Sequence, residues 1–186
     1  IFLLHWWLAQ RDAVRDDDER ASRVRGIFFY GVLLATLIPV VQSLLAIVAR
    51  LLLSALGQAE VQAVVGGGQT ALDNLISIAV NGVVSYYFLR QLAADWRANL
   101  PGNTLAEERR LYRTVWVIYG LLLLTAGVRL IVYYILSADT DAMLGNGLAL
   151  ALVGAPVWVF HWRTWQRAAA QPAERRSLLR LVVLYL

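Results

Sequence analysis

Four long apolar runs constrain this chain more than any other feature of its sequence. They cover residues 26–57, 70–92, 111–136 and 142–162. A transmembrane helix needs about 20 mostly apolar residues to cross a hydrocarbon core about 30 Å thick. Only 16% of the residues are charged, whereas about a quarter of a soluble domain is charged. We therefore predict an all-α integral membrane protein with four complete spans.

Two shorter apolar segments, residues 1–8 and 177–186, lie at the two ends of the chain. At about 1.5 Å per residue, neither segment is long enough to cross the bilayer. We interpret them as two further, partial spans and expect the native protein to extend beyond both ends. Residues 1–186 then form one transmembrane helical domain of a longer chain.

The basic residues predict the orientation of the spans. All 17 are arginines, and 15 of them lie in residues 11–25, 90–113 and 163–180. Because short Arg-rich loops stay in the cytoplasm, we predict that these three loops are cytoplasmic. The connections at residues 58–69 and 137–141 contain no arginine and are expected on the opposite side.

Two of the Arg-rich loops share the pattern H-W-x-x-x-Q-R, which begins at His5 and again at His161. These are the only two histidines, and the separation of 156 residues accommodates two units of about 78 residues. We predict direct repeats of a two-helix transmembrane hairpin. The units cover about residues 5–82, 83–160 and 161–186, and the last is incomplete.

Each Arg-rich loop also ends with a glutamate six residues before an arginine. A glutamate in the first helical turn can accept hydrogen bonds from unpaired backbone N–H groups there and favours the helix dipole. We therefore expect helices to start near these glutamates, the first of them after an N-cap at Asp16, and the arginines to face lipid head groups at the membrane edge. The three pairs are Glu19 and Arg25, Glu107 and Arg113, and Glu174 and Arg180.

Two segments carry a resemblance to a known family. Residues 154–163 (GAPVWVFHWR) and 174–180 (ERRSLLR) resemble an uncharacterised family of bacterial multi-pass membrane proteins, classed as a domain of unknown function, with repeated HWxxxQR…ERRSLLR motifs. The resemblance implies a repeated helical membrane protein, and with it the bacterial inner membrane. It implies no activity and no catalytic residue.

The paired motifs offer candidate ligands in His5 and His161, each followed by a tryptophan, Trp6 and Trp162. Neutral imidazole suits the metal of haem or of a chlorophyll-type pigment. The alternative is that His and Trp anchor the helices at head-group level, where amphipathic rings are enriched. Adjacent tryptophans favour anchoring, and a proton-linked switch is a third possibility.

Polar residues recur every four positions in the second complete span, at Asp73, Ser77, Asn81 and Ser85. This spacing places them on one face of a helix. Such a face is typical of a substrate or ion path, but also of a packing seam whose polar groups form hydrogen bonds between helices. Asp73 has a local alternative, because Thr70-x-x-Asp73 resembles a capping box.

Arg50 and Arg129 are the two arginines outside the Arg-rich loops. Either could pair with Asp73, the one acid inside a complete span, or could extend to the outer head groups. The three consecutive glycines at residues 66–68 predict a flexible loop. With no cysteine, no HExxH and no GxSxG pattern, we identify no catalytic residue and no protein-bound metal.

We predict a structural or scaffolding membrane module whose Arg-rich loops contact anionic lipid or a protein partner, such as another membrane subunit. The pI near 9.8 would suggest nucleic acid in a soluble protein, but here the charges flank spans and favour anionic head groups. One alternative is a transporter or channel that uses the polar face of the second complete span. Another is a subunit that binds haem or a pigment at its histidines.

Overall fold

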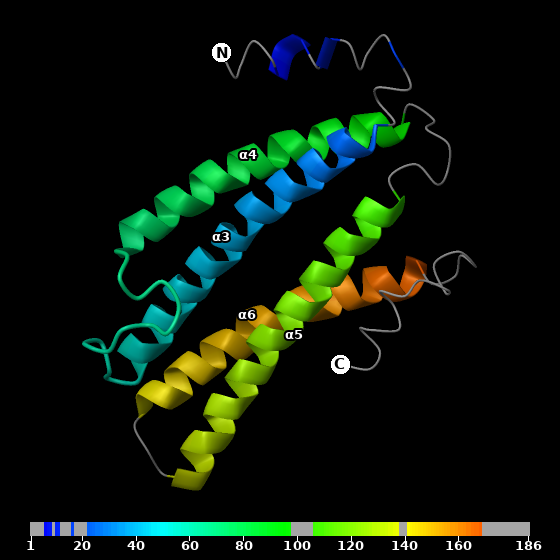
Figure 1. Cartoon of the computed structure of the whole chain (residues 1–186). Helices are drawn as coiled ribbons and strands as arrows, with labels where there is room; N and C mark the ends of the chain where they lie inside the picture. The colour runs from blue at the N-terminus through cyan, green and yellow to red at the C-terminus, as the bar shows by residue number, and fades with distance from the viewer. Residues whose placement is uncertain are drawn as a thin grey trace.

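Four long helices make up the fold of this chain in a computed structural model. The structure describes residues 6–8, 10, 11, 16, 22–97, 106–137 and 141–168. The helices are α3 (Arg23–Ala55), α4 (Ala71–Arg97), α5 (Ala106–Ser137) and α6 (Asp141–Ala168) (Figure 1). Each is long and apolar enough to cross a membrane. The prediction of an all-α membrane protein with four complete spans is confirmed.

The helices extend past the apolar runs at several ends. Helix α4 ends at Arg97, whereas its apolar run ends at residue 92. Helix α5 begins at Ala106, whereas its apolar run begins at residue 111. A helix does not stop where the hydrocarbon core stops, because backbone hydrogen bonds continue through charged turns at head-group level. The first of the four long helices, α3, starts at Arg23, with Ser22 in the N-cap position. The cap predicted at Asp16 therefore does not begin this helix.

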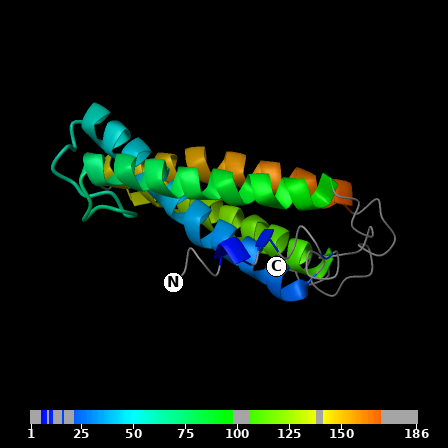
Figure 2. The ribbon, with the colours of Figure 1, turned by 90° about the horizontal axis from the view of Figure 1, so that it is seen from above.

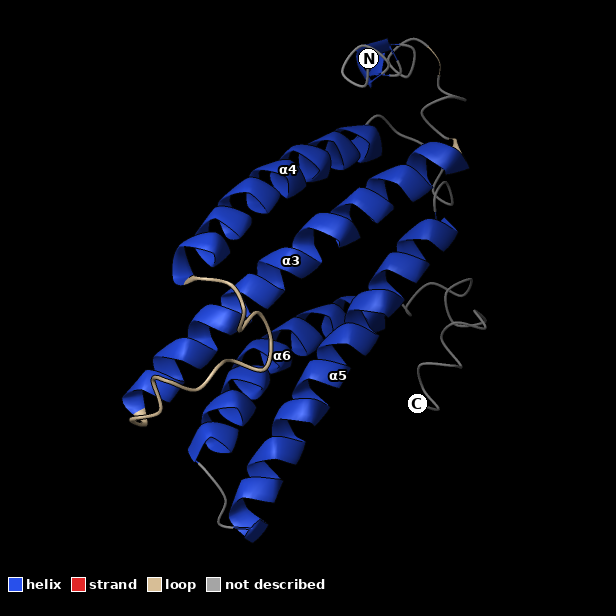
Figure 3. Cartoon of the chain, turned by 60° about the vertical axis from the view of Figure 1, so that its left-hand side comes forward, coloured by secondary structure: helices blue, strands red, loops and turns tan. Residues whose placement is uncertain are grey.

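The helices form two antiparallel hairpins, α3 with α4 and α5 with α6, and α3 contacts all three other helices (Figures 2 and 3). Contacts between side chains place the starts of α3 and α5 beside the ends of α4 and α6. We call this the Arg-rich end, because it carries Arg23, Arg25, Arg97, Arg109, Arg110, Arg113, Arg163 and Arg167. The loop of residues 56–70 lies at the opposite end, the loop end.

Glycines bring α5 and α6 into close contact. A Cβ atom added to Gly120 would lie 2.7 Å from the backbone nitrogen of Trp158, and one on Gly127 would lie 2.7 Å from that of Ala151. Gly154 of α6 approaches the backbone nitrogen of Leu124 in the same way, at 2.8 Å. Small residues allow helix backbones to approach closely, which favours association in a membrane through van der Waals contact.

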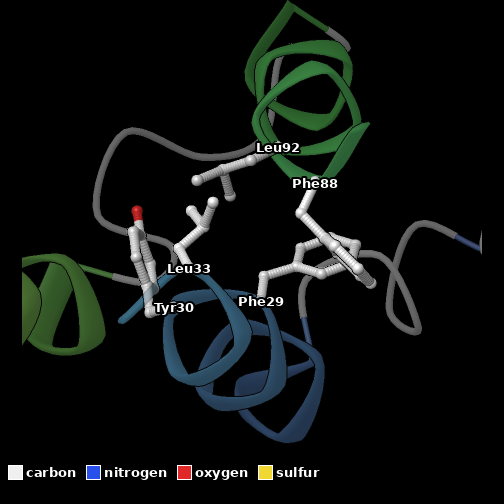
Figure 4. Packing of buried hydrophobic residues seen from close by; sticks show 5 residues of the cluster. All are labelled: Phe29, Tyr30, Leu33, Phe88 and Leu92. Carbon is white, nitrogen blue, oxygen red and sulfur yellow. The ribbon is translucent and has the colours of Figure 1, made fainter. Parts of the chain in front are cut away.

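The α3–α4 pair instead packs through large side chains near the Arg-rich end. Phe29, Tyr30 and Leu33 of α3 are buried against Phe88 and Leu92 of α4 (Figure 4). Phe29 and Phe88 meet edge to face, with ring centroids 5.8 Å apart, which is a favoured aromatic geometry. This cluster holds the start of α3 against the end of α4.

At the loop end, residues 56–70 fold back onto the helices. Ala63 is buried against Ala49 of α3 and Ala149 of α6, and the N–H of Val64 donates to Asn146 Oδ1 of α6 at 2.9 Å. Gly66 has a φ of +68°, a left-handed conformation that glycine adopts without a steric cost. The loop is therefore packed against both hairpins at Ala63 and Val64, and the flexibility of residues 66–68 stays a prediction.

Candidate functional site

A buried ion pair joins the two helices of the first hairpin at the Arg-rich end. Arg25 Nε of α3 donates to Asp95 Oδ2 of α4 at 3.1 Å, and the two side chains are 8% and 9% exposed. Arg25 also donates to Gln10 Oε1 at 3.0 Å and lies over the ring of Phe29. Because these contacts bury the guanidinium of Arg25 inside the protein, the prediction that it faces lipid head groups is wrong.

A second set of ion pairs joins the two hairpins. Arg23 of α3 contacts both carboxylates in the first turn of α5, Glu107 and Glu108, with a distance of 3.0 Å from Nε to Glu108 Oε1. Glu108 is almost fully buried, whereas Arg23 and Glu107 are exposed. Glu107 lies in the first turn of α5, where the sequence predicted the start of a helix, and the residues before Ala106 lie outside the described part of the chain. Both glutamates also bind a neighbouring helix.

Aromatic rings line the junction of α3, α5 and α6 beside these ion pairs. Tyr30 of α3 lies against Tyr112 of α5, with centroids 5.2 Å apart, and Tyr112 meets Trp116 at 6.3 Å. His161 of α6 stacks on Trp116 almost in parallel, at 4.9 Å and 7°. The imidazole is thus half-buried within the helix bundle, between the two helices of the second hairpin.

The tryptophans of the two H-W motifs have different surroundings. Trp6 donates from Nε1 to the hydroxyl of Tyr87 on α4 at 2.9 Å and packs on Phe88. Trp162 lies in a stack along α6 with Trp158 and Trp165. His5 and Arg180 lie outside the described residues, so the proposed equivalence of the two histidines stays a prediction.

The polar residues of α4 take part in local contacts and in contacts with α3. Ser85 is buried and shares a 2.7 Å hydrogen bond with Thr36 of α3. Asn81 donates to the backbone carbonyl of Ser77 at 2.9 Å. Asp73 accepts hydrogen bonds from the N–H and hydroxyl of Thr70, at 2.8 and 2.7 Å, and its own N–H donates to the Thr70 hydroxyl. This is the geometry of a capping box.

The charge of Arg50 acts on the Asp73 carboxylate, but the two form no ion pair. Arg50 donates to the carbonyl of Gly66 at 3.4 Å, and Arg129 is exposed on α5. Among the residues that the structure describes, no ion pair joins Asp73 to Arg50 or Arg129. Within the same residues, no group of three or more His, Asp or Glu side chains is arranged to hold a metal ion.

Several residues that shape the Arg-rich end were missed in the sequence. Asp95 and Glu108 lie in charged stretches of the sequence that are typical of solvent-exposed segments. Only the structure shows that these two acids are buried. Arg113, a predicted head-group contact, is half-buried on α5, and its charge acts on the nearby hydroxyl of Tyr30 together with that of Arg109.

Comparison with known proteins gives a family but no function. No curated protein matches the chain, and no solved structure does. A family model described as "Domain of unknown function (DUF5671)" matches residues 1–94 and 110–186. This match covers both hairpins and most of the chain. The chain is therefore a multi-pass membrane protein that belongs to the DUF5671 family.

Proposed function

We propose that this chain is a structural module of the bacterial inner membrane, whose Arg-rich end faces the cytoplasm and contacts anionic lipid. The proposal is supported by the contacts that polar side chains form between neighbouring helices. The Thr36–Ser85 pair links α3 to α4, and the Arg25–Asp95 pair links the same helices at the Arg-rich end. Such groups hold helices together and give the membrane a rigid, charged surface.

The dimensions of the helices support a repeated hairpin. The helices that start at the Arg-rich end, α3 and α5, have 33 and 32 residues, and the helices that return have 27 and 28. The hairpins differ in the length of their connections, which cover residues 56–70 and 138–140, and in their packing, which uses large side chains between α3 and α4 and glycines between α5 and α6. Two spans per unit would give every copy the same orientation, as parallel repeats require.

The same contacts argue against the alternative functions. A transport path would need the polar groups of α4 to face water, but Ser85 is buried against α3 and Asn81 bonds back to its own helix. The imidazole of His161 stacks by its face on Trp116 of α5. The stack supports a role in anchoring α6 to α5.

A lipid-dependent stability measurement tests the proposal. The purified chain would be reconstituted in nanodiscs of pure phosphatidylcholine or with about a quarter phosphatidylglycerol, and its thermal unfolding followed by circular dichroism. We expect anionic lipid to raise the midpoint, and high salt to remove most of the gain because exposed charges are screened within about 10 Å at 0.1 M salt. Replacing the exposed Arg163 and Arg167 by glutamine should reduce the gain.

An equal midpoint in both lipids would contradict the proposal. A parallel assay of ion and solute efflux from proteoliposomes tests the transporter alternative. Efflux that depends on Asn81, and that Asn81→Leu abolishes while the fold is retained, would favour a transport path instead. No change of efflux over protein-free vesicles is the result that a structural module predicts.

A further inference from the structure

The start of α5 has an excess of hydrogen-bond donors. Its two acids, Glu107 and Glu108, both bind Arg23 of α3, and Asp95 of α4 binds Arg25. The carboxylates that α4 and α5 bring to this end are therefore bound to the arginines of α3. The positive charge of Arg109, two turns before Trp116 on the same helix, is not balanced by these acids.

Two buried polar groups in this part of the molecule form no hydrogen bond. The hydroxyl of Tyr30 is buried and forms no hydrogen bond, and the Nε–H of Arg109 is buried in the same way. Tyr30 is 5% exposed, and the charge of Arg109 lies near enough to act on its hydroxyl. Buried donors without a partner are rare in folded proteins and cost free energy. An acceptor placed between them would remove this cost.

Packing places Tyr30 against the first turns of α5. Its ring lies on Tyr112 of α5, with centroids 5.2 Å apart, and it stands apart from the rings of Phe29 and Phe88 (Figure 4). Arg109 precedes Tyr112 by three residues and therefore lies on the same face of α5. Tyr30 lies seven residues after the start of α3 at Arg23, or about 10 Å along the helix, and tyrosine is enriched near the ends of membrane spans, where lipid head groups lie.

We propose that the phosphate group of an anionic phospholipid binds at the start of α5, held by the guanidinium of Arg109 and the hydroxyl of Tyr30. A phosphate offers several acceptor oxygens, and arginine binds it with directional, charge-assisted hydrogen bonds. Arg109 is only partly buried, so part of its side chain is reachable from the interface. The inference rests on the proposed contact with anionic lipid and assigns that contact a defined site.

The size of the change in lipid affinity distinguishes a defined site from general attraction to a charged surface. One arginine near an anionic surface changes binding by about fivefold. A hydrogen bond to a charged group in a defined site changes it by more, about tenfold or above. Arg167, which is exposed near the end of α6, provides the matched control for Arg109.

Native mass spectrometry of the full chain in neutral detergent tests the site, with dioctanoyl phosphatidylglycerol as the added lipid. We expect one tightly bound lipid per chain. Arg109→Gln should weaken its binding by at least about tenfold. Tyr30→Phe, which keeps the ring and its packing but removes the hydrogen bond to the charged phosphate, should weaken it by about tenfold. Arg167→Gln should weaken it by no more than about fivefold. Circular dichroism establishes that each variant is folded.

The outcomes distinguish the site from the proposed function. Equal loss in Arg109→Gln and Arg167→Gln, with a retained preference for phosphatidylglycerol over dioctanoyl phosphatidylcholine, would overturn the site and leave the proposed function intact. No preference between the two lipids would overturn both. Displacement of the lipid by inorganic phosphate at the same concentration would show that the site takes free phosphate and not a lipid.

Discussion

Replacement of Gly127 by valine is expected to abolish stable packing of α5 on α6. A Cβ atom on Gly127 would lie 2.7 Å from the backbone nitrogen of Ala151 and 2.8 Å from the carbonyl oxygen of Gly147. Both neighbours are backbone atoms of α6, so no side-chain rotation relieves the contact. Overpacking of this kind costs about 1–3 kcal/mol even where side chains can adjust, and here a whole helix must move. Thermal unfolding in detergent, followed by circular dichroism, measures the loss.

The chain supplies a matched control for this prediction. A Cβ atom on Gly82 of α4, or on Gly31 of α3, would meet nothing within 4 Å. Replacing a helical glycine by alanine removes a backbone penalty of about 1 kcal/mol. Gly82→Ala should therefore leave stability unchanged or raise it, whereas Gly127→Ala should lower it. The same sign at both positions would show that α5 and α6 are not in close contact at Gly127.

The second large effect is expected when Asp95 is replaced by alanine. The guanidinium of Arg25, 8% exposed in the ion pair, would then be buried without its carboxylate. Removing one partner of a buried pair costs about 3–5 kcal/mol, because the remaining charge is left uncompensated. Unfolding in urea or by heat in detergent should show a loss of this size in the Asp95→Ala variant.

Removal of both charges distinguishes a buried pair from a surface one. The double variant Arg25→Met with Asp95→Leu should recover most of the stability, because apolar side chains of similar size can replace a buried pair at little cost. Glu107→Gln, which changes the exposed acid bound by Arg23, is the control and should have a small effect. A double variant as unstable as Asp95→Ala alone would contradict the role assigned to the pair.

The apolar runs were sufficient to predict the four spans, because length and hydropathy decide whether a helix crosses a membrane. The partners of charged residues could not be predicted in this way. Asp95 and Glu108 lie in stretches that also hold solvated charges, and only packing decides which acid is buried. The spacing of Arg25 matched that of Arg113, yet Arg25 is buried and bound to Asp95 while Arg113 is half-buried on α5.

The packing of glycines was equally hidden from the sequence. Gly31, Gly82, Gly120 and Gly127 look alike as helical glycines, but only the last two touch another backbone. A flexible loop was predicted at residues 66–68 because of their three consecutive glycines. The structure adds contacts that this composition did not predict, because Gly66 adopts a positive φ beside Ala46 and the N–H of Val64 donates to Asn146. In both cases contact with a second element decides the role of a glycine.

Cysteine labelling of single-cysteine variants in intact cells is the most direct test of the membrane arrangement. The chain has no native cysteine, Ala94 is exposed near the Arg-rich end, and a side chain at Gly68 meets nothing within 4 Å. A Cβ on Gly67 would lie 2.3 Å from the carbonyl oxygen of Ala63, so Gly68 is the better position. We predict that a membrane-impermeant maleimide labels the Gly68→Cys variant in intact cells and the Ala94→Cys variant only after permeabilisation. Labelling of the Ala94→Cys variant in intact cells would contradict the orientation, and labelling of both variants would contradict the membrane-spanning arrangement itself.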